Sequence, residues 1–256
     1  MSAACRRGFN GRMRIRRTAL GIAGALACAV ALALLTYRRW RPWCLHWGAL
    51  NDEVDRVLPG DELMEYPDLV TTRAIGIRAP AASVWPWLVQ MGPGRAGAYT
   101  YDWIENLAGL DMHSADEIIP DFQHVQVGDS WKLGSKGAVL RVESITPASS
   151  LVLRSDDGNW VWAFVLVPDD GGTRLISRNR INQSGASTGA RAAMRYLMEP
   201  GSLVMERKML LGIRDRAESP HAEPVTRHHE SPATSNASST VGSSSTSSRR
   251  SPGTTT

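Results

Sequence analysis

The stretch that decides the fold is Trp160-Val161-Trp162-Ala163-Phe164-Val165-Leu166-Val167, which leads through Pro168-Asp169-Asp170-Gly171-Gly172 into residues 173–181. Alternate side chains of a strand point to opposite faces, and both faces of 160–167 are apolar. The Asp and Gly residues between the two runs favour a tight turn. The sequence therefore predicts a β-hairpin whose first strand has a hydrophobic core on one side and a second dry surface on the other.

Working outward from the hairpin, the pattern predicts further short strands at 71–78, 130–133, 138–145 and 151–154. A Pro-kinked apolar helix is expected over 81–91, and Thr100 is expected to cap a helix that ends near Gly109. A last helical region runs to about Glu218, interrupted at Pro200-Gly201. The order predicts an α+β fold, in which a curved antiparallel sheet wraps around a long C-terminal helix. One helix cannot fill the concave face of a twisted sheet, so we expect a hollow between them.

Several segments carry a resemblance to a known superfamily. They are Leu58-Pro59-Gly60-Asp61, Trp85-Pro86-Trp87-Leu88-Val89-Gln90-Met91-Gly92, Tyr101-Asp102-Trp103-Ile104-Glu105-Asn106-Leu107 and Met205-Glu206-Arg207-Lys208-Met209-Leu210. With the order of elements, they make residues 47–218 resemble the SRPBCC superfamily, also called START-like or helix-grip, and within it a bacterial, membrane-anchored branch. The resemblance implies the helix-grip fold and a hydrophobic cavity for lipids, polyketides or similar small molecules. It implies no single reaction, because relatives include carriers and cyclases.

The N-terminal part of the chain predicts membrane attachment. Residues 1–46 hold nine Arg and no acid, and six of these Arg lie in the basic arm, residues 1–17. Residues 47–218 have a net charge of −6, and this acidic balance argues against nucleic-acid binding by the domain. Residues 18–37 lack charge and are long enough to cross a bilayer as a helix. Arg residues are more numerous before this run than after it, which favours a single-pass protein of the cell membrane with a cytoplasmic N-terminus. A cleaved signal peptide is the alternative.

The remaining composition limits the chemistry. Residues 219–256 are rich in Ser and Thr and are expected to be disordered. Residues 47–218 contain no Cys, which excludes a disulfide, a thiolate metal site and a cysteine nucleophile there. Gly92-Pro93-Gly94-Arg95-Ala96-Gly97 matches a dinucleotide-binding motif, but it lacks the preceding strand and the following βα units. We therefore expect neither a cofactor nor a metal ion, and the sequence leaves the oligomeric state open.

Three functions remain open for residues 47–218. The first is a binding module, in which a hydrophobic small molecule or lipid occupies the cavity and Arg95 or Arg178 meets its polar end. The second is a cyclase-like or dehydratase-like enzyme acting on a bound carbonyl compound, with Tyr99, Tyr101, Asp102 and Glu105 as candidate catalytic residues. The third is a structural envelope protein whose interior is filled by its own side chains. The aromatic residues expected to line a cavity are Trp85, Trp87, Trp131, Trp160, Trp162 and Phe164.

Overall fold

The computed structural model describes residues 3–107, 109–134 and 137–219, with side chains from residue 21 onward except at Ala23. Of the tail predicted to be disordered, residues 220–256 lie outside the described residues. The side chains of the basic arm, residues 1–17, lie outside them as well.

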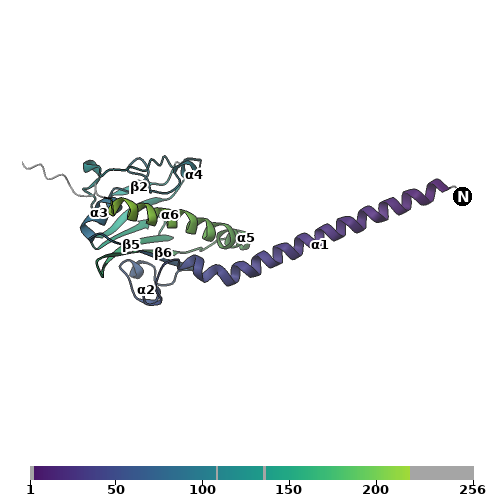
Figure 1. Ribbon diagram of the computed structural model, residues 1–256, viewed down its shortest axis with the longest axis horizontal. Coiled ribbons are helices and arrows are strands. Elements are labelled where there is room, and N and C mark those ends of the chain that lie inside the picture. Colours follow the sequence, from purple (N-terminus) through teal and green to yellow (C-terminus); the bar gives the residue numbers. More distant parts are fainter. Residues whose placement is uncertain (1–2, 108, 135–136, 220–256) are drawn as a thin grey trace, which may run out of the picture. The chain divides into compact units, whose positions relative to one another are not determined.

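A single antiparallel sheet of six strands forms the centre of the domain, in the order β1-β6-β5-β4-β3-β2 (Figure 1). The predicted hairpin is confirmed, because β5 and β6 pair along their whole length from Trp160↔Ile181 to Asp169↔Gly172. The strands are β1 (Leu69–Ile77), β2 (Ser130–Lys132), β3 (Val139–Thr146), β4 (Ser150–Ser155), β5 (Trp160–Asp169) and β6 (Gly172–Ile181).

The C-terminal helix lies against the concave face of this curved sheet (Figure 1). The predicted α+β helix-grip fold is thereby confirmed, and helix α3 adds to the layer that covers the sheet. The helices are α1 (Ala3–Leu45), α2 (Asn51–Asp55), α3 (Ala81–Val89), α4 (Asp102–Leu107), α5 (Thr188–Ala193) and α6 (Glu199–Ala217), with 3-10 turns η1 (Asp61–Leu63) and η2 (Pro120–Phe122) and a π-helical turn η3 (Met194–Met198).

The main hydrophobic core lies between the concave face and helices α3 and α6. Phe164 of β5 and Leu175 of β6 are fully buried there, against Leu88 of α3 and Leu210 and Ile213 of α6. These side chains come from alternate positions of the strands and from helical spacings of three and four, so each element presents one apolar face to the core. This core fills one part of the space under α6 and leaves the other part open as a cavity.

The opposite, convex face of the hairpin is also dry, as its sequence predicted. Val165 and Ile176 pack against Leu58, and Val161 packs in a separate cluster with Met64. The covering segment, residues 49–65, is held by ion pairs to β6, in which Arg174 contacts Glu53 of α2. Burial alone would raise the pKa of Glu53, but hydrogen bonds from Arg174 and from the Leu50 amide hold it below its usual value.

Residues 18–37 lie within the helix α1, so the predicted helix is confirmed. In the part of the chain that the structure describes, no helix has both the length and the apolar character needed to cross a membrane. The prediction that this helix spans a membrane is therefore not supported. The C-terminal part of α1 is attached to the domain, because Arg41 makes two hydrogen bonds to Glu199 at the start of α6.

Two local predictions need correction. Thr100 does not cap a helix: α4 begins at Asp102, and the Thr100 hydroxyl is buried without a hydrogen-bond partner. The expected break at Pro200-Gly201 is instead the π-helical turn η3, which leads directly into α6. Pro200 lies in the first turn of α6, where backbone amides have no acceptor within the helix. The amide proton that proline lacks therefore costs no helical hydrogen bond.

Candidate functional site

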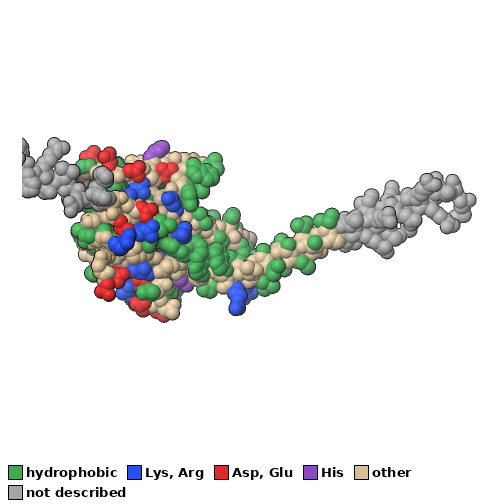
Figure 2. Space-filling model, in the orientation of Figure 1, with side chains coloured by type: hydrophobic (Ala, Val, Ile, Leu, Met, Phe, Trp, Pro, Cys, Tyr) green, Lys and Arg blue, Asp and Glu red, His purple; other side chains and the backbone are tan. Residues whose placement is uncertain are grey.

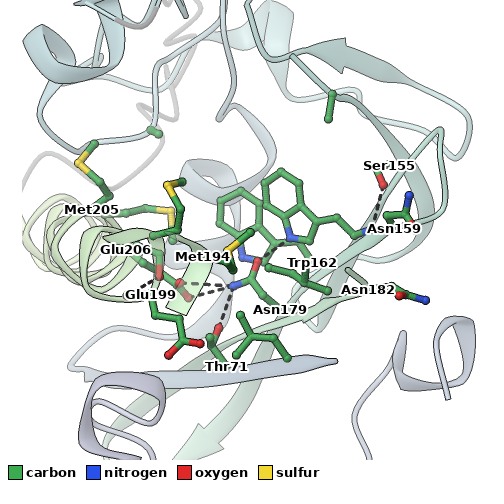
Figure 3. Close-up of a pocket in the computed structure, with 18 of the residues that line it drawn as sticks. Thr71, Ser155, Asn159, Trp162, Asn179, Asn182, Met194, Glu199, Met205 and Glu206 are labelled. Carbon is green, nitrogen blue, oxygen red and sulfur yellow. Dashed lines mark hydrogen bonds between the residues drawn. The ribbon is translucent and has the colours of Figure 1, made fainter. Parts of the chain in front are cut away.

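A cavity of about 510 Å³ lies between the concave face of the sheet and the helical segment η3-α6 (Figure 3). Its size falls in the range of small-molecule pockets, and strands β1, β4, β5 and β6 form much of its wall. The hollow expected from the helix-grip arrangement is therefore present.

Two stacked indole rings form the aromatic wall of the cavity. The rings of Trp160 and Trp162 have centroids 5.5 Å apart and are inclined by 18°. The Trp160 Nε1–H donates to Asn179 Oδ1 at 2.8 Å, and the Trp162 Nε1–H donates to Ser177 Oγ at 2.9 Å. Because both polar N–H groups are bonded to β6, the indoles present mainly hydrocarbon to the cavity.

Methionine side chains form the helical wall opposite the sheet. They recur at positions that share one helical face, and the unbranched thioether side chain adapts to ligands of different shape. This wall contains Met194, Met198, Met205 and Met209.

A buried polar network borders the cavity where β1 and β6 meet α6 (Figure 3). The amide of Asn179 donates to Glu206 Oε2 at 3.3 Å and to Thr71 Oγ1 at 3.3 Å. Glu206 is neutralised by Arg73, which is completely buried and also donates to the carbonyl of Cys44 and to Ser202. A paired carboxylate of this kind holds the sheet, α6 and the end of α1 together.

Glu199 is a second cavity-lining acid with a full set of partners. Arg41 donates to both of its carboxylate oxygens, at 2.6 and 2.8 Å, and the hydroxyl of Tyr37 donates at 2.8 Å. The bidentate Arg–carboxylate geometry is a strong, directional contact. Glu199 is therefore part of the attachment of α1 to the domain.

Thr100 and Glu105 also line the cavity, and they differ from the other polar residues. Glu105 on α4 is 9% exposed, and its Oε2 and the Thr100 hydroxyl are both buried without a hydrogen-bond partner. Burial raises the pKa of Glu105, the Thr100 hydroxyl beside it opposes that rise, and the nearby charge of Asp102 adds to it. Thr100 is thus a neighbour of the carboxyl group, although the two do not form a hydrogen bond of normal geometry. This edge of the cavity therefore holds unsatisfied hydrogen-bonding groups, which in folded proteins are rare and call for a physical explanation.

The structure divides the six aromatic residues expected to line the cavity. Trp160 and Trp162 line it. Trp87 and Phe164 are buried in the main core instead, and Trp85 and Trp131 pack against that core. The division arises because the core fills the part of the sheet next to α3, and the void begins only beyond Phe164.

Neither Arg95 nor Arg178, expected at a ligand's polar end, lines the cavity. Arg178 points to the convex face, where its five N–H donors bind Thr72, Asp61 and the carbonyls of Glu53, Val54 and Arg56. Arg95 donates to the carbonyls of Val89 and Phe122 and stacks on the rings of Phe122 and Trp131. Arg178 has no donor left for a ligand, and Arg95 fastens its own loop to η2.

The structure separates the four candidate catalytic residues, and only Glu105 lines the cavity. The Tyr99 hydroxyl is buried and donates to the carbonyl of Trp87 at 3.0 Å. The carboxylate of Asp102 accepts hydrogen bonds from the amide and hydroxyl of Ser114, at 2.7 and 2.6 Å. Tyr101 is 37% exposed. Proximity in sequence was therefore misleading, because the tight turn at Tyr99, with a φ of 58°, sends neighbouring side chains in different directions.

Several cavity residues were not identified from the sequence. The methionine spacing was a usable signal, since positions 194, 198, 205 and 209 share one helical face. Asn179, Glu199, Glu206 and Thr100 gave no such signal, because their place depends on the packing of distant segments. Among the described residues, no three His, Cys, Asp or Glu side chains are placed to hold a metal ion.

The strand order and the long terminal helix over a cavity define a class of fold, the α+β helix-grip arrangement. No family model matches the chain, and no curated protein matches it. The chain is similar to the solved structure of a Polyketide_cyc-like protein from Corynebacterium glutamicum, with 14% sequence identity and a TM-score of 0.37, over 57% of this chain and 88% of that one. It is similar to the Aha1 dimer from Colwellia psychrerythraea, with 14% identity and a TM-score of 0.36, over 59% of this chain and 96% of that one. It is also similar to an AHSA1-like protein from Aeromonas hydrophila, with 15% identity and a TM-score of 0.34, over 63% of this chain and 100% of that one.

Proposed function

We propose that residues 47–218 form a binding module that holds a hydrophobic small molecule or lipid in the cavity. The observation that carries the proposal is the pocket itself, a space of about 510 Å³ that is open to solvent on one side and lined mainly by apolar side chains, as small-molecule sites commonly are. The tryptophan and methionine walls supply the apolar surface that such a ligand would cover.

The expected affinity follows from the buried area. Covering roughly 300 Å² of ligand surface yields about 7 kcal/mol, from which the loss of ligand freedom must be subtracted. Apolar contact alone therefore supports binding in the micromolar range or weaker, and tighter binding needs polar contacts.

Trp fluorescence tests the proposal, with 1-dodecanol as a neutral amphiphilic probe. Titration of the full chain should change the Trp emission in a saturable way. The change should be largely lost in the double variant W160F/W162F. It should be kept in the matched control W103F, because Trp103 is 69% exposed and does not line the cavity. A wild-type protein that gives no saturable response, and retains no apolar molecule in native mass spectrometry, would contradict the proposal.

The enzymatic alternative, a cyclase or dehydratase, has weaker support. Of its four candidate side chains only Glu105 lines the cavity, and general acid–base catalysis needs the group within reach of the reacting atoms. Turnover of a bound carbonyl compound that is abolished by Glu105→Gln, with the compound still bound, would favour the enzyme over the binding module.

Attachment to the cell membrane through residues 18–37, with a cytoplasmic N-terminus, remains a separate prediction. It is supported by exposed apolar side chains on the described part of α1, which Figure 2 shows in green; they include Ile22, Leu26, Val30, Leu32 and Leu35. Retention of the full chain in a carbonate-washed membrane fraction would support the prediction. Complete release, or a mature N-terminus beyond residue 37, would contradict it.

A further inference from the structure

The cavity contains one buried acid that has no ion-pair partner among the described residues. Glu105 is 91% buried, it lines the cavity, and its Oε2 lacks a hydrogen-bond partner. The hydroxyl of Thr100, at the same edge of the cavity, also lacks one. An unsatisfied carboxyl group in an apolar site is costly, so the arrangement is best explained by a partner that arrives with the ligand.

The other acids that line the cavity do not need such a partner. Glu199 is paired with Arg41, and Glu206 is paired with Arg73. Asp157 accepts hydrogen bonds from Ser155 and Asn159. Glu105 is therefore the acid whose interactions the folded chain leaves incomplete.

The sign of the cavity's charge limits the ligand. Its described lining residues include four acids and no Lys, Arg or His. Because Glu199 and Glu206 are paired with Arg41 and Arg73, the buried carboxyl group left without a cation is that of Glu105. The head group of an anionic amphiphile, such as a fatty acid, would be repelled beside it. A neutral head group is tolerated, and a cationic one is attracted.

The aromatic wall of the cavity also favours a positively charged ligand group. The stacked rings of Trp160 and Trp162 line the cavity, and the electron-rich face of an indole attracts a cation. An acid without a partner, aromatic rings and the absence of basic side chains from the described lining together match an organic cation attached to an apolar body.

We propose that the ligand is a hydrophobic amine, whose ammonium group pairs with Glu105 and donates a hydrogen bond to the Thr100 hydroxyl. This inference rests on the proposed function, since it assigns the polar end of a ligand whose apolar part fills the cavity. The amine supplies the charge and the N–H donors that both side chains lack.

Three probes with the same alkyl chain test the inference by isothermal titration calorimetry on the full chain at pH 7, below their micellar concentrations. They are dodecylamine, 1-dodecanol and dodecanoate, and the amine is protonated at this pH. We expect the amine to bind at least about tenfold more tightly than the alcohol, and dodecanoate to bind most weakly.

Two variants identify the residue responsible. Glu105→Gln should lower the affinity for dodecylamine to that for dodecanol, so that the preference for the amine is lost. The matched control Asp111→Asn removes the same charge from a side chain that is 78% exposed, and it should bind like the wild type.

The outcomes separate the two proposals. Equal affinity of the wild type for amine and alcohol, or an equal loss of both in Glu105→Gln, overturns the amine assignment and leaves the hydrophobic binding module standing. If none of the three probes binds, the binding module itself fails. The comparison of probes on the wild type needs no variant, so it remains decisive even if Glu105→Gln does not fold.

Discussion

The two faces of the β5-β6 hairpin differ in how their charged side chains are paired. On the convex face, Arg178 is buried and pairs with Asp61, and the partly buried Arg174 pairs with the buried Glu53, so each guanidinium is matched by a carboxylate. On the concave face, the cavity includes Glu105, whose Oε2 has no partner. A charge that is fully paired within the chain stabilises the fold, whereas an unpaired group in a void indicates a ligand. Substitutions on each face can test whether paired and unpaired charges have these different roles.

The largest effect is expected on the convex face, from Arg178→Met. The substitution removes five hydrogen bonds and leaves Asp61 with Arg180 as its remaining charged partner, so unfolding should become easier by about 3–5 kcal/mol. Urea denaturation measures this loss. The control Arg141→Met breaks a half-exposed pair with Asp156 and should change stability by less than about 1 kcal/mol. Similar losses in both variants would contradict the special role of the convex face.

An intermediate effect is expected where α6 supports the loop that carries Thr100 and Glu105. A Cβ atom on Gly212 would lie 2.6 Å from the Tyr99 carbonyl oxygen and 2.7 Å from the Tyr99 Cβ, so Gly212→Ala must displace this loop. We expect a loss of about 1–3 kcal/mol and weaker amine binding. Gly201→Ala is the control on the same helix, since a Cβ there meets nothing within 4 Å. It should be neutral or stabilise the protein, by up to about 1 kcal/mol. Equal behaviour of the two variants would show that the close contact has no energetic importance.

The smallest effect is expected on the stability of the unliganded protein, from Glu105→Gln. The raised pKa of Glu105 means that folding favours its protonated form. Its contribution to stability is therefore complete below the unfolded-state pKa, near 4.5, and is lost as the pH rises through the folded-state pKa. Glu105→Gln should therefore raise the melting temperature of the unliganded protein at pH 7. The gain should shrink as the pH falls toward 4. A variant that is less stable than the wild type at pH 7 would show that the carboxylate has a partner in the folded chain.

Local patterns were sufficient to predict most of the fold. The alternation in 160–167 and the Asp-Gly turn predicted β5, its turn and β6, and the helical region before Glu218 predicted α6. The candidate site was predicted only in part. Trp160 and Trp162 line the cavity as expected, and Glu105, expected as a catalytic candidate, also lines it. Arg178, expected at a ligand's polar end, lies on the convex face instead.

The difference has a physical reason. Period-two and helical patterns are local properties, so the sequence by itself determined the strands, the hairpin and the expectation of a hollow under the last helix. Which polar groups find partners depends on segments far apart in the chain, such as Arg41 with Glu199 and Arg178 with Asp61. That Arg73 pairs with Glu206 while Glu105 lines the pocket without an ion-pair partner follows from how distant segments pack, because pairing depends on spatial neighbours and not on spacing along the chain.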